Sequence, residues 1–194
     1  SELDCLRRAS GDALRSAEEI RRLATDVRTT VEYPATGLAG ALRFVARAID
    51  SDLGARLFFV SLGGFDTHAG QDVSHPQLLA ELGGALEAFV KDLDRMDRTK
   101  EVLVLAFSEF GRRLAENASA GTDHGAAGPV LLVSGALSGG LHGAVPDLGA
   151  LADGDLRYGV DFRSVYAAVL QDWLEADAAG VLGEGVEPLG HLFA

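Results

Sequence analysis

Residues 57–62 read LFFVSL, and residues 102–107 read VLVLAF. Neither run alternates apolar with polar side chains, and unbroken apolar runs of this length are typical of strands covered on both faces, as in parallel α/β sheets. Between the two runs, Ser74 and Pro76 suit the cap and first turn of a helix whose apolar side chains recur at helical spacing as far as Leu93. The order strand, helix, strand predicts a right-handed βαβ unit.

Further elements are expected on both sides of this unit. Apolar side chains at spacings of three and four predict an amphipathic helix within residues 3–27 and a second helix over residues 38–49. A third strand is expected over residues 130–133, and Asp161 is expected to cap a last helix. No repeat, low-complexity tract or linker divides the sequence, so we predict one domain over residues 1–194.

Composition excludes several classes of protein. The 194 residues are 47% hydrophobic and 24% charged, which is ordinary for a globular protein. The 29 acidic residues outnumber the 17 basic ones, whereas nucleic-acid binding needs a basic surface. No stretch approaches the roughly 20 apolar residues of a membrane span, and the single cysteine, Cys5, cannot form an intramolecular disulfide. We expect neither a nucleic-acid partner nor a membrane span.

Three polar clusters lie at the ends of the predicted strands, over residues 63–68, 108–112 and 122–125. Ligands of open α/β sheets bind beyond the carboxyl ends of the strands, so we expect the clusters to meet there. The third cluster precedes its strand, and a parallel strand would carry it to the opposite edge. We therefore predict that strand 130–133 runs antiparallel to strand 102–107.

The side chains in these clusters are suited to a metal ion. Carboxylates and imidazoles bind zinc, manganese or a similar divalent metal, and such an ion activates water or holds a phosphoryl oxygen. An arginine can bind a phosphate or sulfate with two hydrogen bonds, which makes Arg112 the candidate for the anion. The candidate metal ligands are Asp66, His68, Glu109, Asp123 and His124.

Each cluster also has a purely structural interpretation. Asp66 would cap a turn, and Glu109 would cap a helix over residues 110–117, because a carboxylate suits a helix N-terminus. Residues 123–125 would form a turn in which glycine supplies a positive φ, and Arg112 would pair with a surface carboxylate. The placement of all three clusters at the ends of predicted strands favours a shared metal site over these structural interpretations. The sequence holds no Gly-x-Ser-x-Gly elbow, Walker loop or dinucleotide fingerprint that would name another chemistry.

Four stretches resemble the family known as domain of unknown function 1501. They are LGGFDTHAGQ (62–71), VLAFSEFGRRLAENASAGTDHGAAGPVLLVSG (104–135), GGLHGAVPDL (139–148) and DLRYGVDFRSVYAAVL (155–170). The resemblance runs from Tyr33 to Trp173 and corresponds to the C-terminal half of a typical member. That family is similar to the alkaline phosphatase and sulfatase superfamily. The resemblance therefore implies an alkaline-phosphatase-like α/β fold, a three-layer sandwich with a mixed, mostly parallel sheet, of which this chain is one part.

The resemblance also assigns roles to individual residues. Asp66 and His68 look like the metal ligands that follow one core strand of the superfamily. Residues 108–111, SEFG, resemble its Ser-Asp-His-Gly motif, with Glu109 in place of the aspartate and Phe110 in place of a histidine ligand. Residues 123 and 124 look like the late histidine-bearing loop. Phe110 cannot bind a metal, and the superfamily's N-terminal strand with its nucleophile has no counterpart here.

We therefore expect a metal-dependent hydrolase of phosphate or sulfate esters with an incomplete site in this chain. Its ligand would be a small ester or another anion, and a missing N-terminal half or a second copy of the chain would complete the site. The alternative is a non-catalytic module that retains the fold and binds a metal, a ligand or a partner, so enzymatic activity itself is left open. Members of the family often carry an export signal, and a periplasmic location follows from the resemblance alone.

Overall fold

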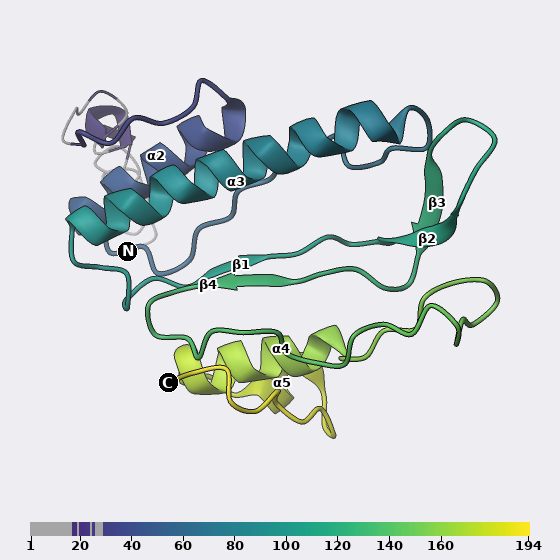
Figure 1. The fold of residues 1–194 in the computed structure, drawn as a ribbon. Helices are drawn as coiled ribbons and strands as arrows, with labels where there is room; N and C mark the ends of the chain where they lie inside the picture. Colours follow the sequence, from purple (N-terminus) through teal and green to yellow (C-terminus); the bar gives the residue numbers. More distant parts are fainter. Residues whose placement is uncertain (1–16, 19, 24, 26–28) are drawn as a thin grey trace, which may run out of the picture. The chain divides into compact units, whose positions relative to one another are not determined.

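The computed structural model describes residues 17–18, 20–23, 25 and 29–194 (Figure 1). Its elements, in chain order, are α2 (Gly37–Asp50), α3 (Gln71–Arg95), β1 (Val104–Ala106), β2 (Gly111–Glu116), β3 (Thr122–Gly125), β4 (Leu131–Val133), α4 (Phe162–Ala168), the π-helix η1 (Val169–Trp173) and α5 (Ala178–Leu182). The chain divides into two compact units. The first holds the described residues up to 65 together with 76–97, and the second holds 66–75 and 98–194.

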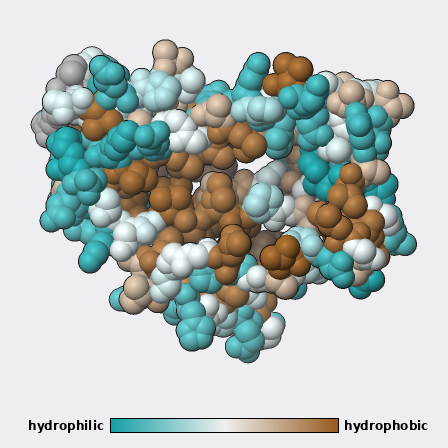
Figure 2. Space-filling view, in the orientation of Figure 1, coloured by the Kyte–Doolittle hydropathy of each residue, from teal (hydrophilic) through white to brown (hydrophobic). Residues whose placement is uncertain are grey.

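The sheets contradict the predicted three-layer, mostly parallel sandwich. The described strands form two separate two-stranded sheets, β1 with β4 and β2 with β3, and both are antiparallel. Residues 57–62 form no strand, so the predicted βαβ unit is wrong, and Leu57 and Phe59 are 75% and 84% exposed. Figure 2 shows hydrophobic side chains uncovered over a broad part of the face in view. An apolar run indicates residues that favour burial, but only a neighbouring strand can supply the hydrogen bonds of a ladder.

The predicted direction of the strand near residue 130 is confirmed. In the antiparallel pair, Val104 of β1 lies opposite Val133 of β4, and Ala106 lies opposite Leu131. The chain therefore leaves β1 and re-enters β4 at the same end of this sheet. The connection between β1 and β4 contains the β2–β3 hairpin.

Helix α2 confirms its prediction, and Thr36 caps it by accepting a 3.3 Å hydrogen bond from the Ala39 backbone N–H. Helix α4 also confirms its prediction, since Asp161 accepts from the Arg163 N–H at 2.9 Å. The short helix α5 was not predicted. Most of the helix expected within residues 3–27 lies outside the described residues, and its described positions from 17 to 25 are helical. No helix of the described part is long and apolar enough to cross a membrane.

Helix α3 begins at Gln71, before the predicted cap at Ser74. The reason lies in the second unit. The Gly70 N–H donates to the Ser119 carbonyl at 3.1 Å, and the Gln71 N–H donates to the Ala120 carbonyl at 2.9 Å. These carbonyls satisfy N–H groups at the start of a helix that would otherwise need a side-chain cap. Contacts distant in sequence therefore extend the helix by four residues, 71–74.

A buried carboxylate organises the first unit. Asp92 is 1% exposed and accepts hydrogen bonds from Thr29 Oγ1 at 2.7 Å, Tyr33 Oη at 3.1 Å and Arg95 Nε at 2.9 Å. Burial, together with the adjacent Asp92 carboxylate, raises the pKa of Tyr33 well above its usual range. Since Phe89 on the same helix is also buried, this polar cluster lies next to the core of the unit.

Replacement of Asp92 tests the importance of this cluster. Asp92→Asn keeps the shape but removes the charge that three donors share, so the free energy of unfolding should fall by about 1.5–3 kcal/mol. The matched control is Glu87→Gln, which removes an exposed carboxylate 2.6 Å from Lys91 and should change stability by less than about 0.5 kcal/mol. Urea unfolding followed by circular dichroism measures the free energy of unfolding of both variants. Equal losses of stability in the two variants would contradict a special stabilising role for Asp92.

The raised pKa of Tyr33 predicts a loss of stability in alkali. The folded state holds the phenol proton more tightly than the unfolded state, whose tyrosine pKa is about 10. The contribution of Tyr33 is therefore complete below about pH 10 and is lost as the pH rises further. We expect the urea midpoint of the native protein to fall more steeply from pH 9 to 11 than that of Tyr33→Phe. Parallel curves would show that Tyr33 is not responsible.

Candidate metal centre

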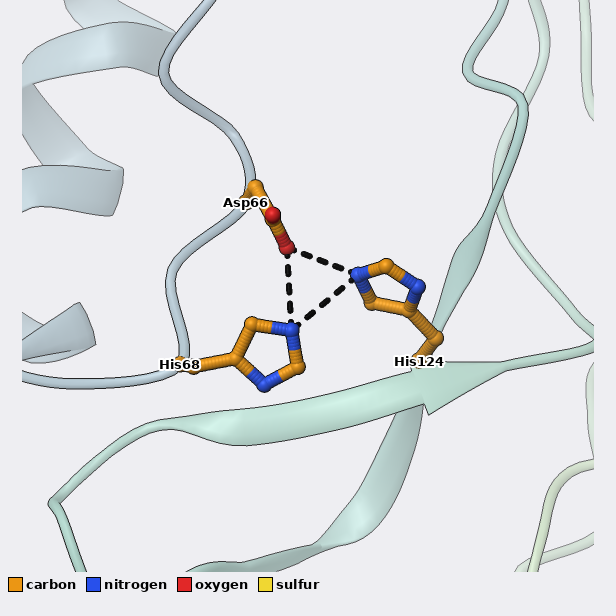
Figure 3. A group of neighbouring side chains, drawn as sticks. All are labelled: Asp66, His68 and His124. Atoms are coloured by element: carbon orange, nitrogen blue, oxygen red, sulfur yellow. Dashed lines mark hydrogen bonds and ion pairs between the residues drawn. The ribbon is translucent and has the colours of Figure 1, made fainter.

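Three predicted side chains converge within the second unit (Figure 3). Asp66 Oδ1 lies 2.7 Å from His124 Nε2 and 3.0 Å from His68 Nε2, and the two Nε2 atoms are 3.2 Å apart. Among the residues that the structure describes, these side chains form a group that could hold a metal ion. Asp66 and His68 precede α3, whereas His124 lies on β3, so residues separated by 58 positions meet here.

A tight hairpin turn brings these segments together. Asn117 Oδ1 accepts hydrogen bonds from the Ser119 N–H at 2.9 Å and the Gly121 N–H at 3.1 Å, and so closes the turn between β2 and β3. Gly121 is buried against the backbone of His68, and a Cβ at this position would overlap the His68 carbonyl group. Glycine therefore permits the close approach that positions His68 beside His124.

The spacing of the three ligand atoms suits a tetrahedral ion. Bonds of about 2.0–2.1 Å to zinc place neighbouring ligand atoms roughly 3.3–3.4 Å apart. The observed separations of 2.7–3.2 Å are slightly shorter, so an outward movement of a few tenths of an ångström would admit the ion. The side chains of His68 and His124 are each 47% exposed, and that of Asp66 is 64% exposed. A fourth position would therefore face solvent, as in catalytic zinc sites.

Positive and aromatic groups surround Asp66. The hydrogen bond from His124 lowers the pKa of the Asp66 carboxyl, and the charges of His68 and Arg112 act in the same direction. Arg112 Nη2 lies 3.7 Å from Asp66 Oδ1, and Nη1 donates to the Thr122 carbonyl. Arg112 thus lies beside the candidate metal ligands. It is also paired with a carboxylate, Asp66, as the alternative structural interpretation expected.

Phe110 has a role that the sequence did not reveal. Its ring stacks on the His124 imidazole, with centroids 3.9 Å apart and planes inclined by 8°, and the Arg112 guanidinium lies 5.0 Å from its centroid. The residue that cannot bind a metal therefore supports one of the candidate ligands. The sequence did contain a signal for a turn at Asn117, because an asparagine side chain often accepts a hydrogen bond from the backbone N–H two residues on, here that of Ser119.

The other two predicted ligands lie outside the group of three. Glu109 is exposed between β1 and β2, and Asp123 Oδ1 lies 3.2 Å from Nδ1 of His68, on the opposite side of that ring from Asp66. Hydrogen bonds from Asn117 and His68 lower the pKa of Asp123. Direct ligation by Glu109 and Asp123 stays a prediction.

Two structural interpretations of the clusters are wrong. Residues 111–116 form β2, so Glu109 caps no helix over residues 110–117. Residues 123–125 belong to β3, and Gly125 does not have a positive φ, so this segment is not the proposed glycine turn. The tertiary pairing of the two strands overrides both local signals.

Gly121 gives a test of this geometry. Gly121→Ala should separate the His68 segment from β3 and lower the free energy of unfolding by about 1–3 kcal/mol. The control is Gly139→Ala in the same unit, where a Cβ meets no atom within 4 Å. Thermal unfolding gives the stability, and the imidazole NMR signals of His68 and His124 report the local change. Unchanged imidazole signals in Gly121→Ala would contradict the proposed close approach.

Comparisons with known proteins identify the family alone. Neither the curated proteins nor the solved structures include a match to this chain. The family described as "Protein of unknown function (DUF1501)" matches residues 9–182, which is most of the 194 residues. The chain therefore belongs to the DUF1501 family.

Proposed function

We propose that Asp66, His68 and His124 bind a divalent metal ion and that this ion serves the hydrolysis of a phosphate or sulfate ester. The observation that carries the proposal is the convergence of one carboxylate oxygen and two imidazole nitrogens within 2.7–3.2 Å. Two imidazoles with one carboxylate form a ligand set that suits zinc or a similar transition metal better than calcium or magnesium.

The surroundings favour an anionic substrate. A metal ion at the open site would lower the pKa of a bound water and polarise an ester oxygen. Arg112, 3.7 Å from Asp66, would add a second positive charge beside the ion. A small phosphate or sulfate ester fits this charge pattern, although the chain as a whole carries a net charge of −12. A local positive site of this kind would select a small anion over a large polyanion.

The same proposal includes a relationship to the alkaline phosphatase and sulfatase superfamily. It also assigns this chain to the C-terminal half of a larger site. Both rest on the sequence motifs around Asp66, Glu109 and His124. A missing N-terminal half or a second copy of the chain would then supply the nucleophile. In this scheme Glu109, which is exposed and lies two residues before β2, would take the place of the superfamily's aspartate ligand.

One observation favours the second candidate function, a metal-binding module without catalysis. Phe110 takes the place of an expected ligand and stacks on His124 at 3.9 Å. This stacking would stabilise a three-ligand site, and the phenyl ring itself cannot bind a metal. Such a module would bind the ion, and an anionic ligand through it, without turnover.

Metal binding is the first test. Protein purified without a histidine tag should bind about one equivalent of zinc or manganese, measured by elemental analysis and calorimetry. His68→Ala and His124→Ala should each weaken binding at least 100-fold, because each removes a ligand. The control is His142→Ala, an exposed histidine whose Nε2 contacts the Ser138 carbonyl, and it should bind like the native protein. Failure to bind after metal is added back would refute the proposal.

Turnover then separates the two functions. Metal-dependent release of nitrophenol from p-nitrophenyl phosphate or p-nitrophenyl sulfate should stop in chelator and return with zinc. Arg112→Lys keeps the charge but loses the planar fork, so it should raise KM for these anions more than it lowers kcat. Stoichiometric metal without turnover of either ester would favour the binding module over a hydrolase site that this chain completes alone or with a second copy.

A further inference from the structure

We infer that Asp123 is a positioning residue that holds His68 in the tautomer needed for metal binding. The inference rests on the proposed metal site and deepens it. It replaces direct ligation by Asp123 with a role behind the ligand. The two carboxylates nearest His68 would then differ in function: Asp66 would bind the ion, and Asp123 would orient the ring.

The geometry around His68 separates the two roles. Its Nε2 faces Asp66 at 3.0 Å and His124 at 3.2 Å, whereas its Nδ1 faces Asp123 Oδ1 at 3.2 Å. Both neighbouring carboxylates, when ionised, can only accept a hydrogen bond. An ion bound to Nε2 beside Asp66 takes the lone pair of that nitrogen, so the proton of His68 must then lie on Nδ1, where Asp123 accepts it. A neutral imidazole protonated at Nδ1 has its lone pair on Nε2, which is the atom directed at the proposed ion. Such carboxylate–histidine pairs are common behind metal ligands.

Asn117 fixes Asp123 in turn. Its Oδ1 accepts from the backbone N–H groups of Ser119 and Gly121, so its Nδ2 must face the other way. Nδ2 donates to Asp123 Oδ1 at 3.3 Å and to the His68 carbonyl at 3.0 Å. The amide orientation follows from this network, because the reversed amide would place NH₂ against two N–H donors. The backbone of the hairpin turn therefore orients Asn117, Asn117 orients Asp123, and Asp123 orients His68.

This arrangement distinguishes a positioning residue from a ligand. Loss of a ligand removes a bond to the ion, whereas loss of a carboxylate behind a histidine typically weakens metal affinity 10–100-fold. An asparagine at position 123 can still accept from Nδ1 through its amide oxygen. We therefore expect Asp123→Asn to restore the tautomer and part of the affinity that Asp123→Ala loses.

The experiment measures the tautomer directly. Long-range ¹H–¹⁵N NMR spectra distinguish Nδ1–H from Nε2–H imidazoles, and we would record them on metal-free Asp66→Ala, in which Nε2 of His68 no longer faces a carboxylate acceptor. In this background His68 should be the Nδ1–H form with native Asp123 and with Asp123→Asn, and should shift toward Nε2–H with Asp123→Ala. Zinc affinity, measured by calorimetry on the proteins that retain Asp66, should fall 10–100-fold in Asp123→Ala and less in Asp123→Asn. The control is Asp172→Ala on η1, an exposed carboxylate of the same unit, which should leave both measurements unchanged.

The tautomer spectra and the zinc affinities test the positioning role and the proposed function separately. In the Asp66→Ala background, a His68 proton on Nε2, or a tautomer that does not change when Asp123→Ala is added, would overturn the positioning role whether or not zinc binds. A native protein that binds no zinc would refute the proposed function, while the tautomer spectra would still decide whether Asp123 orients His68. If Asp123→Ala binds zinc as weakly as His68→Ala does, and Asp123→Asn restores nothing, Asp123 is a ligand instead.

Discussion

The antiparallel pairing of β1 with β4 is the constraint on which the candidate site depends. The chain leaves β1 at Ala106 and enters β4 at Leu131 at the same end of this sheet, so the connection between them must return to where it started. The β2–β3 hairpin forms most of this connection, and it places Arg112 opposite His124. Asp66 and His68 then meet the hairpin from another part of the sequence. A parallel β4 would have required a crossover connection in place of this hairpin.

Around this hairpin, neighbouring side chains contact the two candidate histidine ligands and restrict their orientation. Phe110 lies flat against His124, Asp123 contacts the His68 ring at Nδ1, and Asn117 donates to Asp123 and to the His68 carbonyl. Each of the two imidazoles therefore has a partner beyond the proposed ion. Half-exposed ligands without such partners would sample many rotamers, and the entropy of ordering them would reduce metal affinity.

The sequence predicted local features better than pairings. Helices α2 and α4 were predictable because periodic apolar residues and the Thr36 and Asp161 caps encode them locally. The direction of β4 was predicted from the requirement that the 122–125 cluster meet the other two, and the observed pairing agrees. The proximity of Asp66 to His124 was predicted from a parallel strand at residues 57–62 that does not form, so that expectation was right for a wrong reason. The sandwich failed because the run at residues 57–62 says nothing about which strand would pair with it. The support from Phe110 and the early start of α3 depend on contacts between distant residues, and no local pattern records these.

The two hydrogen bonds from Gly70 and Gln71 to the carbonyls of Ser119 and Ala120 have an evolutionary consequence. Exposed hairpin tips usually tolerate insertions and deletions, because little else depends on their length. Here the tip is joined to the start of α3, only a few residues from His68. A residue gained or lost between Asn117 and Gly121 would shift these carbonyls and the segment bonded to them. The length of this surface turn should therefore vary less among relatives than its exposure suggests.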